Sequence, residues 1–370
     1  MSKIKELDTI GQSIWYDYIQ RSLLTSGEFK DLMEKGVSGI TSNPAIFEKA
    51  IAGSKDYDSD LKRLAEEGKS VEEVYEILAV QDIITAADLL KPVYDRTDRR
   101  DGYVSLEVSP NLAYETETTV AEAKRLFEKV NRPNLMIKVP ATPEGIPAVA
   151  ELIGAGVNVN ITLIFSVDNY QQVAEAYLKG LETLAAAGPS LAGGHGIDSI
   201  CSVASFFISR IDTSVDQELE KQNNTSLQGK IGIASAKMAR AAYDSIFSSD
   251  RWKTLAGKGA RVQRLLWGST GTKNPNYSDT LYVDQLIGPD TINTVPPSTL
   301  EKFLEKGVVA ETLTQGMDEA RSQLEELDKL GISLDAVTRK LQEDGVEAFK
   351  KPFAALMNSI SEKSSELAAG

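Results

Sequence analysis

The chain has 370 residues, a hydrophobic fraction of 42%, a charged fraction of 25% and a formal net charge of −14. This acidic balance argues against nonspecific nucleic-acid binding, which requires clustered cations. One cysteine and one histidine exclude a disulfide within the chain and argue against zinc or copper sites, although carboxylate-bound magnesium stays open.

The N-terminal segment MSKIKELDTIGQ has no apolar core, so we expect no signal peptide. No run of about 18 apolar residues follows, so we expect no transmembrane helix. We therefore expect a cytoplasmic protein that contacts neither membrane nor nucleic acid.

Short apolar, β-branched segments recur along the chain and predict eight strands. They lie at residues 13–19, 39–43, 103–109, 134–140, 157–165, 199–207, 261–269 and 293–296. Helical patterns fill the gaps between them, at residues 71–90, 119–130, 167–187 and 228–247. This alternation predicts right-handed crossovers and a parallel sheet. Eight strands in roughly 300 residues favour a closed (β/α)8 barrel, and no GxGxxG or GxxxxGK[ST] motif supports an open nucleotide-binding sheet.

Two helical regions carry further expectations. Thr119 and Glu122 predict a capping box at the start of the helix at 119–130. Residues 301–370 are mostly helical in pattern and rich in charge, so we expect additional C-terminal helices packed on the outside of the barrel. The alternatives for this extension are a lid or a partner surface. We expect residues 1–370 to form a single barrel domain.

Polar side chains interrupt the first three predicted strands near their ends. Asp17 follows Trp15-Tyr16, and Asn43 precedes a proline; each also suits an ordinary cap or turn. Glu107 lies within VSLEVS. It is either a general acid/base or a strand-end carboxylate paired with a lysine.

Lys138 is the sharpest anomaly, because it interrupts the apolar strand LMIKVP. Burial disfavours the charged form of a lysine, and a neutral amine can attack a ketone to form a Schiff base. The alternative is a structural lysine in a buried ion pair. Since the C-terminal strand ends of a barrel carry its chemistry, the position of Lys138 matters for both interpretations.

Three polar residues alternate along the fifth predicted strand. Asn158, Asn160 and Thr162 share one face of this strand, which we expect to be the barrel interior. They either bind a ligand or hydrogen-bond with one another.

Two cations follow later predicted strands. Arg210 lies in a strand-to-helix turn, and Lys273 lies in the glycine-containing stretch GSTGTKN. A cation beside a glycine-containing turn and a helix N-terminus suits a phosphate, whereas surface solvation is the plain alternative. His195 lies in the glycine-rich segment GGHGID and is expected in a loop, and Cys201 is expected to be buried.

At these residues the sequence resembles the transaldolase family, from about residue 8 to residue 300. The resemblance rests on GITSNPAIF (39–47), LEVSP (106–110), LMIKVPAT (135–142), NITLIFS (160–166), SFFISRID (205–212) and STGTKNPNYSDTLYVDQLIG (269–288), the last being similar to a longer bacterial subfamily.

The resemblance implies a (β/α)8 barrel that transfers a dihydroxyacetone unit in the pentose phosphate pathway, without a metal or other cofactor. Sedoheptulose 7-phosphate and glyceraldehyde 3-phosphate would give erythrose 4-phosphate and fructose 6-phosphate. A homodimer is a further expectation.

The resemblance also implies roles for individual residues. Lys138 matches the Schiff-base lysine, and Asp17 matches the acid/base at the C4 hydroxyl of the donor. Glu107 and Thr162 match the pair that holds a catalytic water. The remaining matches are sugar-hydroxyl and phosphate binders, at Asn43, Asn160, Ser205 and Arg210.

The chain departs from the family pattern at a second phosphate arginine, for which Lys273 is the candidate replacement. Phe207 occupies a position associated with transfer rather than simple aldol cleavage. Some relatives are fused to a phosphoglucose isomerase, and we expect no such activity in a chain that ends at Gly370. The alternatives are an aldolase that releases free dihydroxyacetone and a noncatalytic sugar-phosphate-binding protein.

Overall fold

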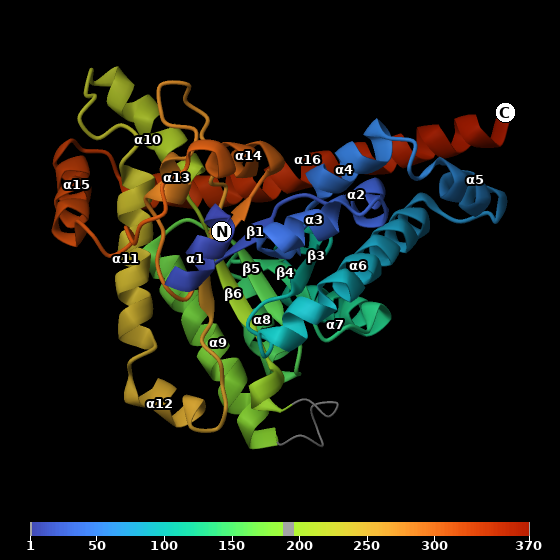
Figure 1. Ribbon diagram of the computed structural model, residues 1–370, viewed down its shortest axis with the longest axis horizontal. Helices are drawn as coiled ribbons and strands as arrows, with labels where there is room; N and C mark the ends of the chain where they lie inside the picture. The colour runs from blue at the N-terminus through green and yellow to red at the C-terminus, as the bar shows by residue number, and fades with distance from the viewer. Residues whose placement is uncertain (1, 188–195, 370) are drawn as a thin grey trace.

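Eight parallel strands close into a barrel in the computed structural model, which describes residues 2–187 and 196–369 (Figure 1). Neighbours in sequence are neighbours in the sheet, and the last strand pairs with the first. The predicted (β/α)8 barrel is therefore confirmed. His195, which was expected in a loop, lies outside the described residues. The strands are β1 Gln12–Tyr16, β2 Val37–Thr41, β3 Tyr103–Glu107, β4 Leu135–Pro140, β5 Val159–Ile164, β6 Ser202–Phe207, β7 Arg264–Gly268 and β8 Thr291–Val295.

Helices surround the barrel and bury their apolar faces against it. The four helices predicted from periodicity are present, although α6 extends further than expected. The helices are α1 Lys3–Ile10, α2 Arg21–Thr25, α3 Glu28–Lys35, α4 Pro44–Gly53, α5 Asp58–Glu66, α6 Val71–Arg96, α7 Thr116–Val130, α8 Gly145–Gly154, α9 Val167–Ala187, α10 Ser209–Lys221, α11 Ile231–Ile246, α12 Asp250–Ala256, α13 Leu281–Asp284, α14 Pro297–Lys306, α15 Met317–Lys329 and α16 Leu334–Ala369, with short 3-10 turns η1 Pro110–Leu112 and η2 Ile197–Ser199.

The start of α7 differs from the prediction. This helix begins at Thr116, so Thr119 lies inside its first turn, and its hydroxyl donates to the Leu112 carbonyl at 2.9 Å. The expected capping box at Thr119 is therefore wrong. A capping box does open α6, where the Ser70 and Glu73 side chains each accept from the backbone N–H of the other.

The N-terminal end of the barrel is closed by a buried polar cluster. Arg264 pairs with Asp101 at 3.2 Å and donates to the Ser13 hydroxyl at 2.9 Å. Asp101 also accepts from the Trp15 indole at 2.7 Å. Cys201 is buried nearby, as predicted. The buried charges of Arg264 and Asp101 are thus paired with each other and with neighbouring polar groups.

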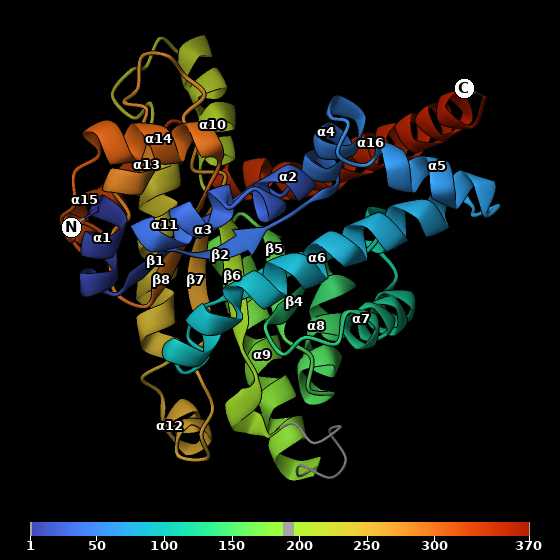
Figure 2. The same cartoon turned by 45° about the vertical axis from the view of Figure 1, so that its right-hand side comes forward.

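Helix α16 crosses the opposite end, above the carboxyl ends of β4 and β5, and then continues beside α4 and α5 (Figures 1 and 2). The amide of Gln342 donates to the carbonyls of Ala141 at 2.8 Å and Leu163 at 3.2 Å. A Cβ on Gly345 would lie 2.9 Å from the Leu163 side chain, so glycine permits this close approach. The C-terminal region thus covers the barrel mouth as well as the outer wall.

Candidate active site

A cavity of about 200 Å³ opens at the carboxyl ends of the strands. Its lining contains all the predicted site residues except Glu107, although they come from six separate segments of the chain. These residues are Asp17, Asn43, Lys138, Asn160, Thr162, Ser205, Phe207, Arg210 and Lys273. The barrel topology brings them together because parallel strands end on the same side.

Lys138 lies at the centre of this group and is only 6% exposed. Its Nζ donates to the backbone carbonyl of Ser42 at 2.8 Å and lies 3.5 Å from the carboxylate of Glu107. The ion pair is therefore long. The Lys138 amine also lines the cavity, where a ligand can reach it. Both interpretations of Lys138, a paired lysine and an amine facing a ligand site, describe this arrangement.

Glu107 ends β3 beside Lys138, in direct register with it. Burial raises the pKa of Glu107, and the neighbouring Lys138 cation only partly opposes this rise. The residue borders a second cavity of about 500 Å³ between α6, α7 and α16. Glu107 therefore lies between the Lys138 amine and this second cavity.

Asp17 follows β1 and accepts a hydrogen bond from the Thr41 hydroxyl at 2.7 Å. Burial raises the pKa of Asp17, against the opposing effects of Lys138 and Thr41. The Thr41 hydroxyl also lies 2.7 Å from that of Thr294 on β8. Asp17 is no helix cap, and its carboxyl is oriented by a side chain from the adjacent strand.

The three polar residues of β5 have different surroundings. Asn158 is structural, because its amide donates to the carbonyls of Pro133 and Leu135 at the far end of the barrel. Asn160 accepts from the Ser205 hydroxyl at 2.6 Å. Thr162 is 1% exposed, and its hydroxyl has no hydrogen-bond partner among the described residues. Such an unpaired hydroxyl facing a cavity indicates a place for water or ligand.

The backbone at the end of β5 is irregular. The pairing of β5 with β6 shifts register between Ile161 and Ile164, and Leu163 has a φ of 59°. A left-handed leucine is costly, and bulges of this kind re-aim neighbouring side chains. The irregular backbone thus coincides with the unpaired Thr162 hydroxyl.

The outer part of the cavity is cationic. Arg210 opens α10 and stacks over the Phe207 ring at 5.4 Å, and no salt bridge holds it among the described residues. Burial lowers the pKa of Arg210, yet a guanidinium stays protonated near neutral pH. Lys273 is exposed in the loop after β7 and lines the same cavity.

Asn43 performs a local task as well as lining the cavity. Its side-chain oxygen accepts from the backbone N–H of Ile46 at 3.0 Å and caps α4. The turn expected at Asn43 is therefore a helix N-cap. The cap uses only the oxygen, so the amide nitrogen of the Asn43 side chain is available to a ligand.

Thr41 and Phe349 are among the residues of this cavity that sequence reasoning missed. Thr41 orients Asp17 and lies on the alternating face of GITSN, so strand alternation was a usable signal. Phe349 comes from α16, far along the chain, and its ring centroid lies 5.9 Å from the Lys138 Nζ. No local pattern predicts that contact.

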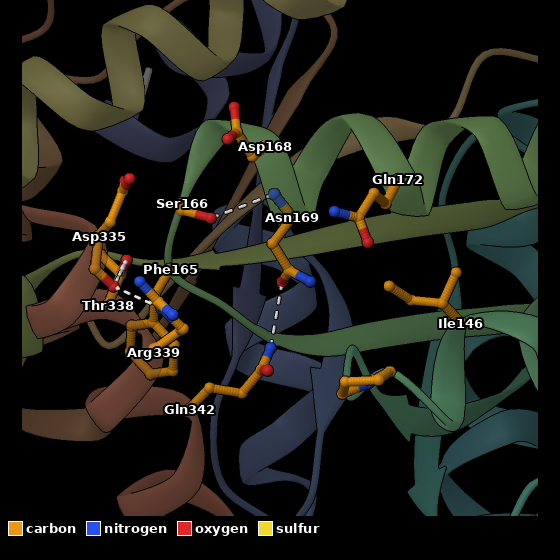
Figure 3. A pocket seen from close by; sticks show the side chains of 11 residues that line it. Ile146, Phe165, Ser166, Asp168, Asn169, Gln172, Asp335, Thr338, Arg339 and Gln342 are labelled. Atoms are coloured by element: carbon orange, nitrogen blue, oxygen red, sulfur yellow. Dashed lines mark hydrogen bonds between the residues drawn. The ribbon is translucent and has the colours of Figure 1, made fainter.

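A third cavity, of about 310 Å³, lies between the starts of α9 and α16 (Figure 3). Its polar residues include Asp168, Arg339 and Gln342, but none of the predicted site residues. Within residues 2–187 and 196–369, no cluster of three or more histidine, cysteine or acidic residues could hold a metal ion. No helix in the same ranges is long and apolar enough to cross a membrane.

Comparison with known proteins agrees with this geometry. The family model described as Transaldolase/Fructose-6-phosphate aldolase matches residues 14–360. A protein named transaldolase from Trichodesmium erythraeum is 46% identical, over 98% of this chain and 97% of its own length. Proteins of the same name from Thiobacillus denitrificans and Thermobifida fusca are 48% and 45% identical, over 97% and 98% of this chain and 100% and 98% of their own lengths.

Proposed function

The chain belongs to the transaldolase/fructose-6-phosphate aldolase family, and we propose that it is a transaldolase in which Lys138 forms the Schiff base with the donor sugar. The observation that carries this assignment is the Lys138 amine, which is buried at the barrel mouth and faces a polar cavity beside two carboxyl groups. The reaction moves a dihydroxyacetone unit from sedoheptulose 7-phosphate or fructose 6-phosphate to an aldehyde phosphate.

The neutral amine of Lys138 adds to the donor ketone, and loss of water gives an iminium. The iminium draws electrons from the C3–C4 bond, so this bond breaks when a base takes the C4 hydroxyl proton. We assign this base to Asp17. The aldehyde product leaves, a three-carbon enamine stays on Lys138, and the acceptor aldehyde reverses the steps.

Glu107 and Thr162 are proposed to hold the water that is lost and regained at the lysine. The upward shift of the Glu107 pKa by burial supports this role, because it makes the carboxylate a stronger base than an exposed one. The unpaired hydroxyl of Thr162 offers the second hydrogen bond to such a water.

The outer residues are proposed to recognise the sugar phosphate. Arg210 binds the phosphate as a cation, with Lys273 as a second cation and Ser205 as a hydroxyl partner. The amides of Asn43 and Asn160 bind sugar hydroxyls. Phe207 forms an apolar wall beside Arg210.

Borohydride reduction tests the assignment directly. Incubation with fructose 6-phosphate and borohydride should add a reduced three-carbon unit to Lys138, detected by peptide mass spectrometry. Lys138→Ala should abolish both the adduct and turnover, whereas Lys62→Ala, on the exposed surface of α5, should change neither. An adduct that survives in Lys138→Ala would reject the assignment.

An assay with fructose 6-phosphate and no acceptor separates transfer from an aldolase that releases free dihydroxyacetone. We also propose a cytoplasmic homodimer that does not bind nucleic acid, and the net charge of −14 supports the last part. Sedimentation equilibrium of the purified chain measures its assembly state.

A further inference from the structure

Helix α16 places one aromatic ring above the reactive lysine. Phe349 is 7% exposed, lines the sugar cavity, and has its ring centroid 5.9 Å from the Lys138 Nζ. The cavity thus has two aromatic residues in its lining, because Phe207 lines it too and lies under Arg210. The Phe349 ring is the one that lies over the Lys138 amine among the described residues.

The sequence of α16 fixes the direction of this ring. Four residues that contact the barrel or its helices recur every seven positions and share one helix face, at Gln342, Phe349, Leu356 and Lys363. Leu356 is fully buried. A long helix with a single inward face can hold an aromatic side chain over the barrel mouth.

Polar anchors hold this helix on both sides of Phe349. Gln342 donates to Ala141 O and Leu163 O, and at 3.2 Å to the side-chain oxygen of Asn169 on α9 (Figure 3). Toward the C-terminus, Lys363 donates to Ile51 O at 3.0 Å and pairs with Asp58 at 2.7 Å. The ring is therefore positioned by contacts on four different elements.

The proposed reaction needs two things at this position. The iminium is a cation, and an aromatic face within about 6 Å of a cation attracts it. The enamine must also be kept from water until the acceptor arrives. Otherwise a proton converts the enamine back to the iminium, water adds to its carbon, and the C–N bond breaks to give dihydroxyacetone and free amine.

We propose that Phe349 is a positioning residue whose ring stabilises the Lys138 iminium and excludes water from the three-carbon enamine. This inference rests on the proposed Schiff-base function. On this inference, α16 determines how much of the enamine is transferred to an aldehyde and how much is lost to water. An alanine opens the space to water, whereas a leucine keeps most of the apolar bulk and removes only the aromatic face.

The test measures two products of fructose 6-phosphate in the variants Phe349→Ala and Phe349→Leu. These are dihydroxyacetone released to water and the sugar phosphate formed with an acceptor aldehyde. Phe349→Ala should raise the ratio of released to transferred product by about tenfold or more. Phe349→Leu should hold that ratio near the wild-type value while lowering kcat by about threefold to tenfold, with KM unchanged.

Phe353→Leu is the matched control, because this phenylalanine lies one turn further along α16 and packs on Tyr75 at 5.6 Å instead of on the lysine. It should leave both ratio and kcat near wild type. If Phe349→Ala does not fold, Phe349→Leu still tests the iminium contact through kcat. An unchanged ratio in folded Phe349→Ala, or an unchanged kcat in Phe349→Leu, overturns the corresponding half of the inference.

Borohydride trapping of the wild-type protein runs in parallel. A wild-type protein with no Lys138 adduct would refute the proposed function itself. A normal adduct together with an unchanged partition in Phe349→Ala would refute only the role of Phe349.

Discussion

The two ends of the barrel each contain a buried cation paired with a carboxylate, and their surroundings differ. At the N-terminal end, Arg264 and Asp101 also bond to Ser13 and Trp15. At the mouth, the pair of Lys138 and Glu107 is longer, at 3.5 Å. A satisfied pair stabilises one arrangement, whereas a loosely held pair beside a cavity leaves its groups free to react.

The largest effect is expected from Asp101→Ala at the N-terminal end. Arg264 would then be buried without its carboxylate, which costs about 3–5 kcal/mol of unfolding free energy. Urea unfolding measures this loss, and kcat per folded molecule should stay within about twofold. Asp98→Ala is the control, because Asp98 is 85% exposed in its pair with Arg261 and its removal should cost about 0.5 kcal/mol or less.

At the mouth, Glu107→Gln should separate activity from stability in the opposite way. Loss of the acid/base group should lower kcat and the rate of borohydride trapping by about a hundredfold to a thousandfold. Stability should change little, because the glutamine oxygen can still accept from the Lys138 amine, which also donates to the Ser42 carbonyl. A variant that unfolds easily but keeps kcat would place Glu107 with the structural pair of the other end.

Stability should also depend on pH through Asp212 on α10, which is buried against the start of α11. Burial raises the pKa of Asp212 to about 7, although its carboxylate accepts from the Gly232 N–H at 2.7 Å. The folded state therefore holds a proton that the unfolded chain has already lost above pH 4. Stability from this group is full below that pH and is lost as pH rises toward 7, by about 2 kcal/mol between pH 5 and 8.

Asp212→Asn removes this titration. Urea unfolding of the two proteins at pH 5 and pH 8 should show a smaller loss in the variant. Equal losses in both would mean that the carboxyl is ionised in the folded protein at pH 5.

The smallest effect is expected from Arg210→Ala. Removing one charged phosphate contact should raise KM for fructose 6-phosphate by about tenfold, with little change in kcat. Unphosphorylated fructose should be used equally by both proteins. If KM rises equally for both donors, Arg210 stabilises the cavity and does not recognise the phosphate.

Much of the fold could be predicted because its signal is local. Alternating apolar segments gave all eight strands in order, with ends displaced by a few residues. The capping box predicted at Thr119 is absent because the Thr119 hydroxyl donates to the carbonyl of Leu112, which belongs to η1. The same motif at Ser70 is present, so the residue pattern alone does not say which turn a helix uses.

The site residues could be predicted where the direction of the parallel strands determines their position. Polar residues at strand ends must meet at the mouth of a parallel barrel, and the predicted residues other than Glu107 line one cavity there. Phe349 and the path of α16 were not predictable, since they depend on Gly345 fitting against Leu163. The spacing along α16 can predict an inward face of the helix, but it does not say which distant segment that face contacts.

The seven-residue spacing of the inward face of α16 limits how this helix can vary in length. Each residue turns an α-helix by about 100°, so one inserted residue between Gln342 and Phe349 would swing the ring away from Lys138. An insertion of seven would restore the direction but carry the ring about 10 Å along the helix axis. Relatives that share this geometry should therefore place their insertions in the loops outside the helix.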